Sequence, residues 1–269
     1  MAIEIRRALI GTSFGQIHCR TAGTGPAIVL LHINQQSSAV FIEMIESLAP
    51  RMRAIAIDYP SHGGSDHVAK QPTIADYARC VVAVMDALGV GKFIALGEAT
   101  GAVVAVELAA SHPDRVGRIV LVNCPFLDPQ LSVEALIAPF QAKFRPSDES
   151  GFPTTRTVRF MLEEDPDHAP LRPTQSWMDR INRAQIEVGR DRWQALTALK
   201  QYDLARGLER IRCPALLLMG EHFYLGKSAD EIRKRLKDLR YELLPDTRFC
   251  AGWERASEIA RLAIEFAGA

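Results

Sequence analysis

The stretch Phe93-Ile94-Ala95-Leu96-Gly97-Glu98-Ala99-Thr100-Gly101 decides the fold of this chain. Its first four residues are apolar, and a short continuous apolar run is typical of a strand buried on both faces. The segment 102–110 that follows is rich in alanine and valine and predicts a mostly buried helix. A buried strand that turns directly into a helix is the repeating unit of a parallel sheet.

Four more short apolar runs repeat this pattern along the chain. Helical stretches separate them, and the clearest is 74–88, because its apolar residues share one helical face and Gly89 follows as a stop signal. The pattern predicts an α/β fold, with a mostly parallel twisted sheet covered by helices on both faces. The runs are Ala27–Leu31, Ala54–Ile57, Arg118–Val122 and Ala215–Met219.

The two ends of the chain extend the expected sheet. Segments 3–10 and 16–21 predict two strands at the N-terminal end. The C-terminal end predicts a helix over 228–236, a strand over 240–244 and a final helix over 254–266.

The strand pattern stops between about residues 126 and 210. This segment carries prolines along its first half and no buried strand run, and it predicts helices over 154–164, 173–188 and 191–206. We therefore expect a core formed by residues 1–125 and 211–269, with residues 126–210 inserted as a helical lid.

Composition excludes several classes of protein. The 269 residues are 48% hydrophobic and 24% charged, with a formal net charge of zero. Disorder requires fewer apolar residues and more net charge, and a nucleic-acid-binding domain usually has a basic excess. We expect an ordinary globular protein that does not bind nucleic acid.

Membrane, secretion, disulfide and metal signals are also missing from the sequence. Each apolar run is far shorter than the ~18 residues of a membrane span, and residues 1–7 alternate like a strand instead of following the layout of a secretion signal. We expect a cytoplasmic protein without a membrane partner. The cysteines are odd in number and form no CxxC pair, so neither disulfides nor a metal site are expected.

Three junctions between strands and loops link the chain to a known superfamily. They are Leu30-Leu31-His32, the turn Asp58-Tyr59-Pro60-Ser61-His62-Gly63-Gly64-Ser65, and Gly97-Glu98-Ala99-Thr100-Gly101. In this order, and over essentially the whole chain, they resemble the α/β-hydrolase superfamily. Its members have a strand ending in His-Gly, an Asp-x-Pro-Gly-His-Gly-x-Ser turn and a Gly-x-Ser-x-Gly nucleophile elbow. The resemblance implies an α/β-hydrolase fold with an inserted lid.

The resemblance also implies a nucleophile, an acid and a base, and the chain departs from the family at all three places. Ala99 stands where the family has Ser, Cys or Asp, Phe223 stands at the place of the acid, and Phe249 at that of the catalytic histidine. Loss of any one member costs several orders of magnitude in rate. The alanine at position 99, taken alone, would be consistent with an engineered substitution that inactivates the protein. Three coincident departures favour a natural sequence adapted to something other than acyl-enzyme chemistry.

Four residues are candidates for the chemistry of the site. In the resembling family, main-chain N–H groups at the positions of Thr100 and Asn34 would stabilise an oxyanion. Burial beside the elbow would raise the pKa of Glu98 and make it a proton donor or acceptor near neutrality. The alternative for Glu98 is a fixed hydrogen bond or salt bridge. His222, two residues past a strand end, is a candidate base, or a loop residue turned to solvent.

A second set of residues is expected to contact the substrate. The side-chain amides in the loop after the first buried strand, and the amide of Asn123, can orient a ligand. For the amides in the loop, the alternative is that they cap the loop backbone. For His32, the resemblance favours a structural role in holding the oxyanion loop, and Ile33 replaces a glycine there. The aromatic residues would make the pocket apolar, although lid aromatics such as Trp177 are usually core. The whole set is His32, Ile33, Gln35, Gln36, Ala99, Asn123, Phe223, Phe249 and Trp177.

Three functions follow from these observations. The first is a cofactor-free lyase, isomerase or cyclase that transfers protons on a small, apolar carbonyl compound. The second is a catalytically silent protein that binds a ligand under its lid. The third is a hydrolase that uses relocated residues, such as a water activated by Glu98. A small molecule is the expected partner in each case. The sequence leaves open whether the chain forms a homodimer.

Overall fold

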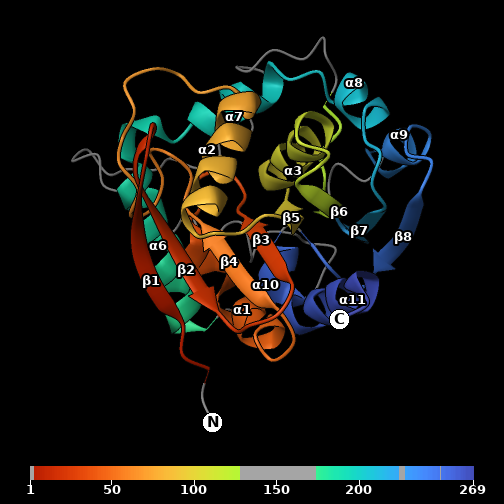
Figure 1. Cartoon of the computed structure of the whole chain (residues 1–269), viewed down its shortest axis with the longest axis horizontal. Coiled ribbons are helices and arrows are strands. Elements are labelled where there is room, and N and C mark those ends of the chain that lie inside the picture. The colour runs from red at the N-terminus through yellow and green to blue at the C-terminus, as the bar shows by residue number, and fades with distance from the viewer. Residues whose placement is uncertain (1–2, 128–173, 224–227, 249) are drawn as a thin grey trace.

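A computed structural model describes residues 3–127, 174–223, 228–248 and 250–269. An eight-stranded sheet with the order β1-β2-β4-β3-β5-β6-β7-β8 forms its centre (Figure 1). Strands β3 to β8 run parallel, whereas β2 pairs antiparallel with both β1 and β4. The strands are β1 (Arg6–Thr12), β2 (Gly15–Ala22), β3 (Ala27–Leu31), β4 (Arg53–Ile57), β5 (Phe93–Glu98), β6 (Val116–Val122), β7 (Ala215–Gly220) and β8 (Leu239–Leu244).

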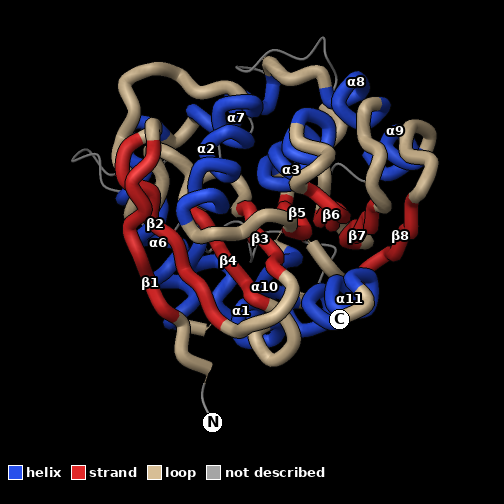
Figure 2. The backbone as a smooth tube through the Cα atoms, viewed as in Figure 1, coloured by secondary structure: helices blue, strands red, loops and turns tan. Residues whose placement is uncertain are grey.

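Helices cover both faces of the sheet (Figure 2). Alternate residues of β5 enter two separate apolar cores, with Phe93 and Ala95 on one face and Ile94 and Leu96 on the other. The described helices are α1 (Ile42–Leu48), α2 (Ile74–Ala87), α3 (Thr100–Ser111), α6 (Gln175–Val188), α7 (Gln194–Lys200), α8 (Leu204–Glu209), α9 (Ser228–Arg233), α10 (Ala251–Glu254) and α11 (Ala256–Ala267), with short 3-10 turns η1 (Ser38–Phe41) and η2 (Gly189–Asp191). The predicted α/β-hydrolase architecture is confirmed.

Two elements differ from the expectations. Helix α1 was not expected; it has no capping side chain to mark its start. The single helix expected over 191–206 is divided into η2, α7 and α8. It restarts at α8 because the Asp203 side chain accepts a hydrogen bond from Arg206 N at 3.0 Å.

The inserted segment lies between β6 and β7 in the chain. Its described part holds α6, α7 and α8, while the helix expected over 154–164 lies outside the described residues. That residues 126–210 act as a lid stays a prediction. Within the described part of the chain, every helix is too short or too polar to serve as a membrane span.

Candidate functional site

The elbow between β5 and α3 keeps a strained backbone although it carries an alanine. Ala99 has φ 49° and ψ −110°, a conformation that L-residues rarely adopt. The glycines on either side permit the sharp turn. A Cβ on Gly97 would lie 2.0 Å from Gly101 O, and a Cβ on Gly101 would lie 1.9 Å from Leu31 O. The sequence therefore brings the start of α3 directly against the end of β3.

The start of α3 is a natural place for a negatively charged oxygen. Thr100 is its first residue, and the first N–H groups of an α-helix have no partner within the helix. The helix dipole adds partial positive charge at the same end. Ala99 N donates to Val122 O at 2.9 Å, which ties the elbow to the end of β6.

The loop after β3 lies beside the elbow and is held by His32. Tyr59 N donates to His32 Nε2 at 3.2 Å, so Nδ1 carries the proton and donates to Ile33 O at 2.8 Å. Complete burial, together with the nearby His62, lowers the pKa of His32 to about 3. Both ring nitrogens are thus engaged within the protein, as expected for a loop-holding role.

The polar residues after His32 form a tight turn. Gln36 N donates to Ile33 O at 3.3 Å, and Gln35 has a positive φ of 61°. Among the described residues, no partner lies within hydrogen-bond distance of the buried Asn34 Oδ1 or Gln36 Oε1. Buried polar atoms normally have partners, so these two oxygens are candidate acceptors for a ligand or a water molecule.

Asp58 holds the neighbouring turn in place. Its carboxylate accepts hydrogen bonds from Ser38 N at 2.5 Å and Gly64 N at 2.9 Å, and pairs with His18 Nδ1 at 2.8 Å. Burial raises the pKa of Asp58, but these hydrogen bonds and the nearby histidines outweigh it and lower the pKa to about 2. The charged carboxylate fixes the loops on which His32 depends.

Glu98 is buried between β5 and α10. Its side chain is almost wholly excluded from solvent, and Oε1 accepts a hydrogen bond from Gly252 N at 3.0 Å. Among the described residues, Oε2 has no hydrogen-bond partner. A Cβ on Gly252 would lie 2.5 Å from Oε2, so a side chain at position 252 would force this carboxyl group to move. Burial, together with the nearby Glu254 charge, raises the pKa of Glu98 to about 8.

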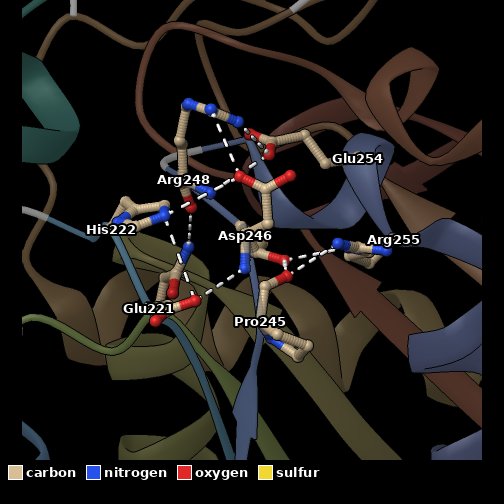
Figure 3. A network of polar contacts seen from close by, with 9 residues as sticks. Glu221, His222, Pro245, Asp246, Arg248, Glu254 and Arg255 are labelled. Carbon is tan, nitrogen blue, oxygen red and sulfur yellow. Dashed lines mark hydrogen bonds and ion pairs between the residues drawn. The ribbon is translucent and has the colours of Figure 1, made fainter. Parts of the chain in front are cut away.

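His222 belongs to a polar network beside the site. Its Nε2 lies 3.7 Å from Asp246 Oδ1 and 3.9 Å from Glu221 Oε2, and its side chain is 22% exposed. Figure 3 shows the imidazole among these carboxylates and Arg248. His222 is therefore neither deeply buried nor fully turned to solvent.

The Asn123 amide joins two strand ends. Its Oδ1 accepts a hydrogen bond from Gly220 N at 2.8 Å, and its Nδ2 donates to Arg248 O at 2.8 Å. These contacts give Asn123 a structural use that the sequence did not indicate. Its role as a substrate contact stays a prediction.

The aromatic candidates are distributed unevenly. Phe223 is 4% exposed and packs in the apolar core that contains α2 and α3 residues. Trp177 is buried on α6, where its ring stacks on Trp253 of α10 at 4.3 Å between centroids. Phe249 lies outside the described residues. The structure thus gives Trp177 a packing role on the face of the sheet toward which Glu98 points.

Sequence reasoning missed the anchoring contacts of the loop after β8. Glu254 Oε2 accepts a hydrogen bond from Arg248 N at 3.0 Å, and Gly252 N anchors Glu98. The residues of this loop follow neither a helical nor a strand pattern. Their partners are distant in the chain or lie in the same irregular loop, so the sequence gives no signal for these contacts. Among the described residues, no group of three His, Cys, Asp or Glu residues is arranged to hold a metal ion.

Sequence comparisons place the chain in a known fold family. A family profile described as alpha/beta hydrolase fold matches residues 26–256. A putative non-heme haloperoxidase of Mycobacterium phage D29 is 36% identical over 104 residues, which are 38% of this chain and 37% of that protein. The 2-hydroxy-6-oxo-6-phenylhexa-2,4-dienoate hydrolase of Comamonas testosteroni is 24% identical over 93% of this chain and 90% of that protein.

Solved structures show the same fold along almost the whole chain. The enol-lactonase of Burkholderia xenovorans LB400 has a TM-score of 0.79 and 20% identity, and the match covers 98% of this chain and 100% of that chain. E-2-(Acetamidomethylene)succinate hydrolase has a TM-score of 0.79 and 21% identity, covering 99% of this chain and 100% of that chain. At this identity the likeness shows the fold alone.

Proposed function

This chain belongs to the α/β-hydrolase fold family, and on that basis we propose that it is an enzyme acting on a small, largely apolar carbonyl compound without forming a covalent bond at position 99. The observation that carries the proposal is the backbone at Ala99. A conformation that costs about 1–3 kcal/mol is kept although the residue has no nucleophilic atom. The conformation still presents the first N–H groups of α3, which suit a carbonyl oxygen that gains negative charge.

The names of the relatives favour hydrolysis over the lyase, isomerase or cyclase reaction considered from the sequence. In the proposed reaction, water attacks the carbonyl carbon while ionised Glu98 takes the water proton. The main-chain N–H groups at Thr100 and Asn34 hold the oxyanion. When the oxyanion collapses, the leaving group departs and takes the proton from Glu98. The step needs no cofactor.

A second candidate is proton transfer on an enol or enolate, in an isomerase, lyase or cyclase reaction. The observation that favours it is the raised pKa of Glu98, about 8, which leaves the carboxyl group mostly neutral at pH 7. A neutral carboxyl group is a proton donor. The two candidates differ in which form of Glu98 reacts: the ionised form in hydrolysis and the neutral form in proton transfer.

The pH dependence of turnover separates the two candidates. If Glu98 is the base of a hydrolysis, kcat rises with pH through about 8; if Glu98 donates a proton, kcat falls through the same range. The measurement uses a panel of p-nitrophenyl esters and enol-lactones for hydrolysis and of keto–enol compounds for isomerisation.

Replacement of Glu98 tests the proposal directly. Glu98→Gln keeps an oxygen that accepts from Gly252 N but removes the titrating group. We expect turnover to fall about 100-fold or more, with product binding within twofold of wild type. Glu254→Gln, which alters a neighbouring buried carboxyl group, is the matched control and should retain turnover within tenfold. A covalent acyl adduct in intact-mass spectra, or turnover that survives Glu98→Gln, would refute the proposal. Ligand binding without any turnover would favour a silent binding protein.

A further inference from the structure

Two arginines of the N-terminal hairpin lie side by side without an acidic partner. Arg7 of β1 and Arg20 of β2 are directly opposite each other in the antiparallel register, so both side chains are on the same face of the sheet. Like charges at opposed positions destabilise a sheet. Within the part of the chain that the structure describes, neither guanidinium forms a hydrogen bond or an ion pair.

Arg20 is the more buried of the two arginines. It is half-buried, whereas Arg7 is exposed, and the Nε of Arg20 is excluded from solvent without a partner among the described residues. A buried charged donor that lacks a partner costs free energy, because it has lost its hydration and gained no hydrogen bond. An acceptor from outside the chain would remove that cost.

Helix α6 brings a third arginine to the same place. Arg183 and Glu187 of α6 are close enough to act on the charge of Arg20. Burial is the largest cause that lowers the pKa of Arg20, and the charges of Arg7 and Arg183 lower it as well. The charges of Asp58 and Glu187 act in the opposite direction. Positive charge from a hairpin and a helix thus gathers around one half-buried guanidinium.

The two carboxylates near Arg20 are already engaged. Glu187 pairs with Arg183, with Oε1 2.8 Å from Nε. Asp58 is held by main-chain N–H groups and by His18. Among the described residues, the two guanidiniums of the hairpin therefore have no carboxylate at ion-pair distance. Two unpaired positive charges suit an anion that carries two negative charges.

We propose that Arg7, Arg20 and Arg183 form a binding site for a phosphate-type dianion. A guanidinium donates two parallel hydrogen bonds to phosphate oxygens and is less strongly hydrated than an ammonium group. The dianion neutralises the two arginines of the hairpin, gives the buried Nε of Arg20 an acceptor and connects the hairpin to α6. None of these residues belongs to the proposed catalytic site, so the inference does not depend on the proposed function.

Calorimetry with inorganic phosphate at constant ionic strength tests the site. We expect saturable binding to wild type, weakened about tenfold or more in Arg7→Gln, because a charge-assisted pair is lost with the guanidinium. Arg6→Gln is the matched control. It removes the same charge from the neighbouring residue, which lies on the other face of β1 and pairs with Glu4. This control should change the affinity less than about twofold.

Vesicles distinguish the two sources of phosphate, a lipid headgroup and a soluble compound. Vesicles of phosphatidylcholine with about one fifth phosphatidic acid present headgroup phosphate. Sedimentation with them that is lost in Arg7→Gln and kept in Arg6→Gln assigns the site to a lipid headgroup. Binding of inorganic phosphate without such sedimentation assigns it to a soluble phosphate. No binding of either probe, or equal losses in the two variants, would overturn the proposal.

Thermal unfolding gives a second readout of the same site. Without phosphate, Arg7→Gln relieves the repulsion of Arg20, so its Tm should equal or exceed that of wild type. Added phosphate should raise the Tm of wild type and of Arg6→Gln more than that of Arg7→Gln, because a ligand of the folded state stabilises it. The general effect of phosphate on protein surfaces is common to all three proteins. A lower Tm of Arg7→Gln without phosphate, or an equal rise with phosphate, would contradict the proposal.

Discussion

At the scale of single residues, Ala99 and Glu98 are the unusual features of this molecule. Ala99 adopts a positive φ of 49° at the junction of β5 and α3. Glu98 is buried, with one oxygen bonded to Gly252 N. Neither arrangement is expected to favour folding, because both the strained backbone and the buried carboxyl group cost free energy. Costs of this kind often accompany functional sites.

Ala99→Gly is expected to stabilise the protein. Glycine adopts positive φ without strain, and the relief of strain exceeds the extra entropy of glycine in the unfolded chain. We expect the free energy of unfolding in urea to rise by about 1 kcal/mol. Ala110→Gly, at an ordinary helical position of α3, is the control and should lower it by about 0.5–1 kcal/mol. A loss of stability in Ala99→Gly would show that the backbone there is not strained.

At the scale of elements, α6 is attached to the core by a few specific contacts. Trp177 stacks on Trp253 of α10, and Arg180 forms an ion pair with Glu43 of α1. On the other side of the insertion, the Gln71 side chain donates to Gln194 O at 2.8 Å. Trp177 is the largest of the side chains that α6 buries.

Trp177→Ala is expected to loosen α6. Removal of a fully buried indole costs about 3–5 kcal/mol. We expect a lower free energy of unfolding and faster hydrogen–deuterium exchange of the amides in 175–188. Ile186→Ala truncates a side chain on the same helix that is 55% exposed, and it should change stability by less than about 0.5 kcal/mol. Unchanged exchange in Trp177→Ala would mean that other contacts hold the helix.

At the scale of the whole molecule, the buried Glu98 links global stability to pH. Its pKa is about 8 in the folded protein, against an ordinary value of 4.5 for a glutamate. Between these values the folded state keeps a proton that the unfolded state releases, so stability falls as pH rises. Asp58 acts in the opposite direction, because its lowered pKa makes stability fall as pH drops below about 4.

Glu98→Gln is expected to remove one of these dependences. The free energy of unfolding of wild type should fall relative to that of the variant by more than about 1 kcal/mol between pH 5 and pH 8, since a full pKa unit corresponds to about 1.4 kcal/mol. Urea unfolding at several pH values measures the difference, and Asp58 contributes equally to both proteins. Parallel stability curves would show that Glu98 ionises alike in the folded and unfolded states.

The sequence by itself determined the sheet, most helices and the elbow. Apolar runs such as Ala27–Leu31 and Ala215–Met219 must be buried on both faces, and that requirement depends only on local residue order. The same order marked Glu98 as a buried carboxyl group. Tertiary structure alone decided that Gly252 anchors Glu98, that the Asn123 amide joins two strand ends and that Trp177 packs on Trp253. Those partners are far apart in the chain, so their meeting depends on how the packed elements fit together, which no local pattern encodes.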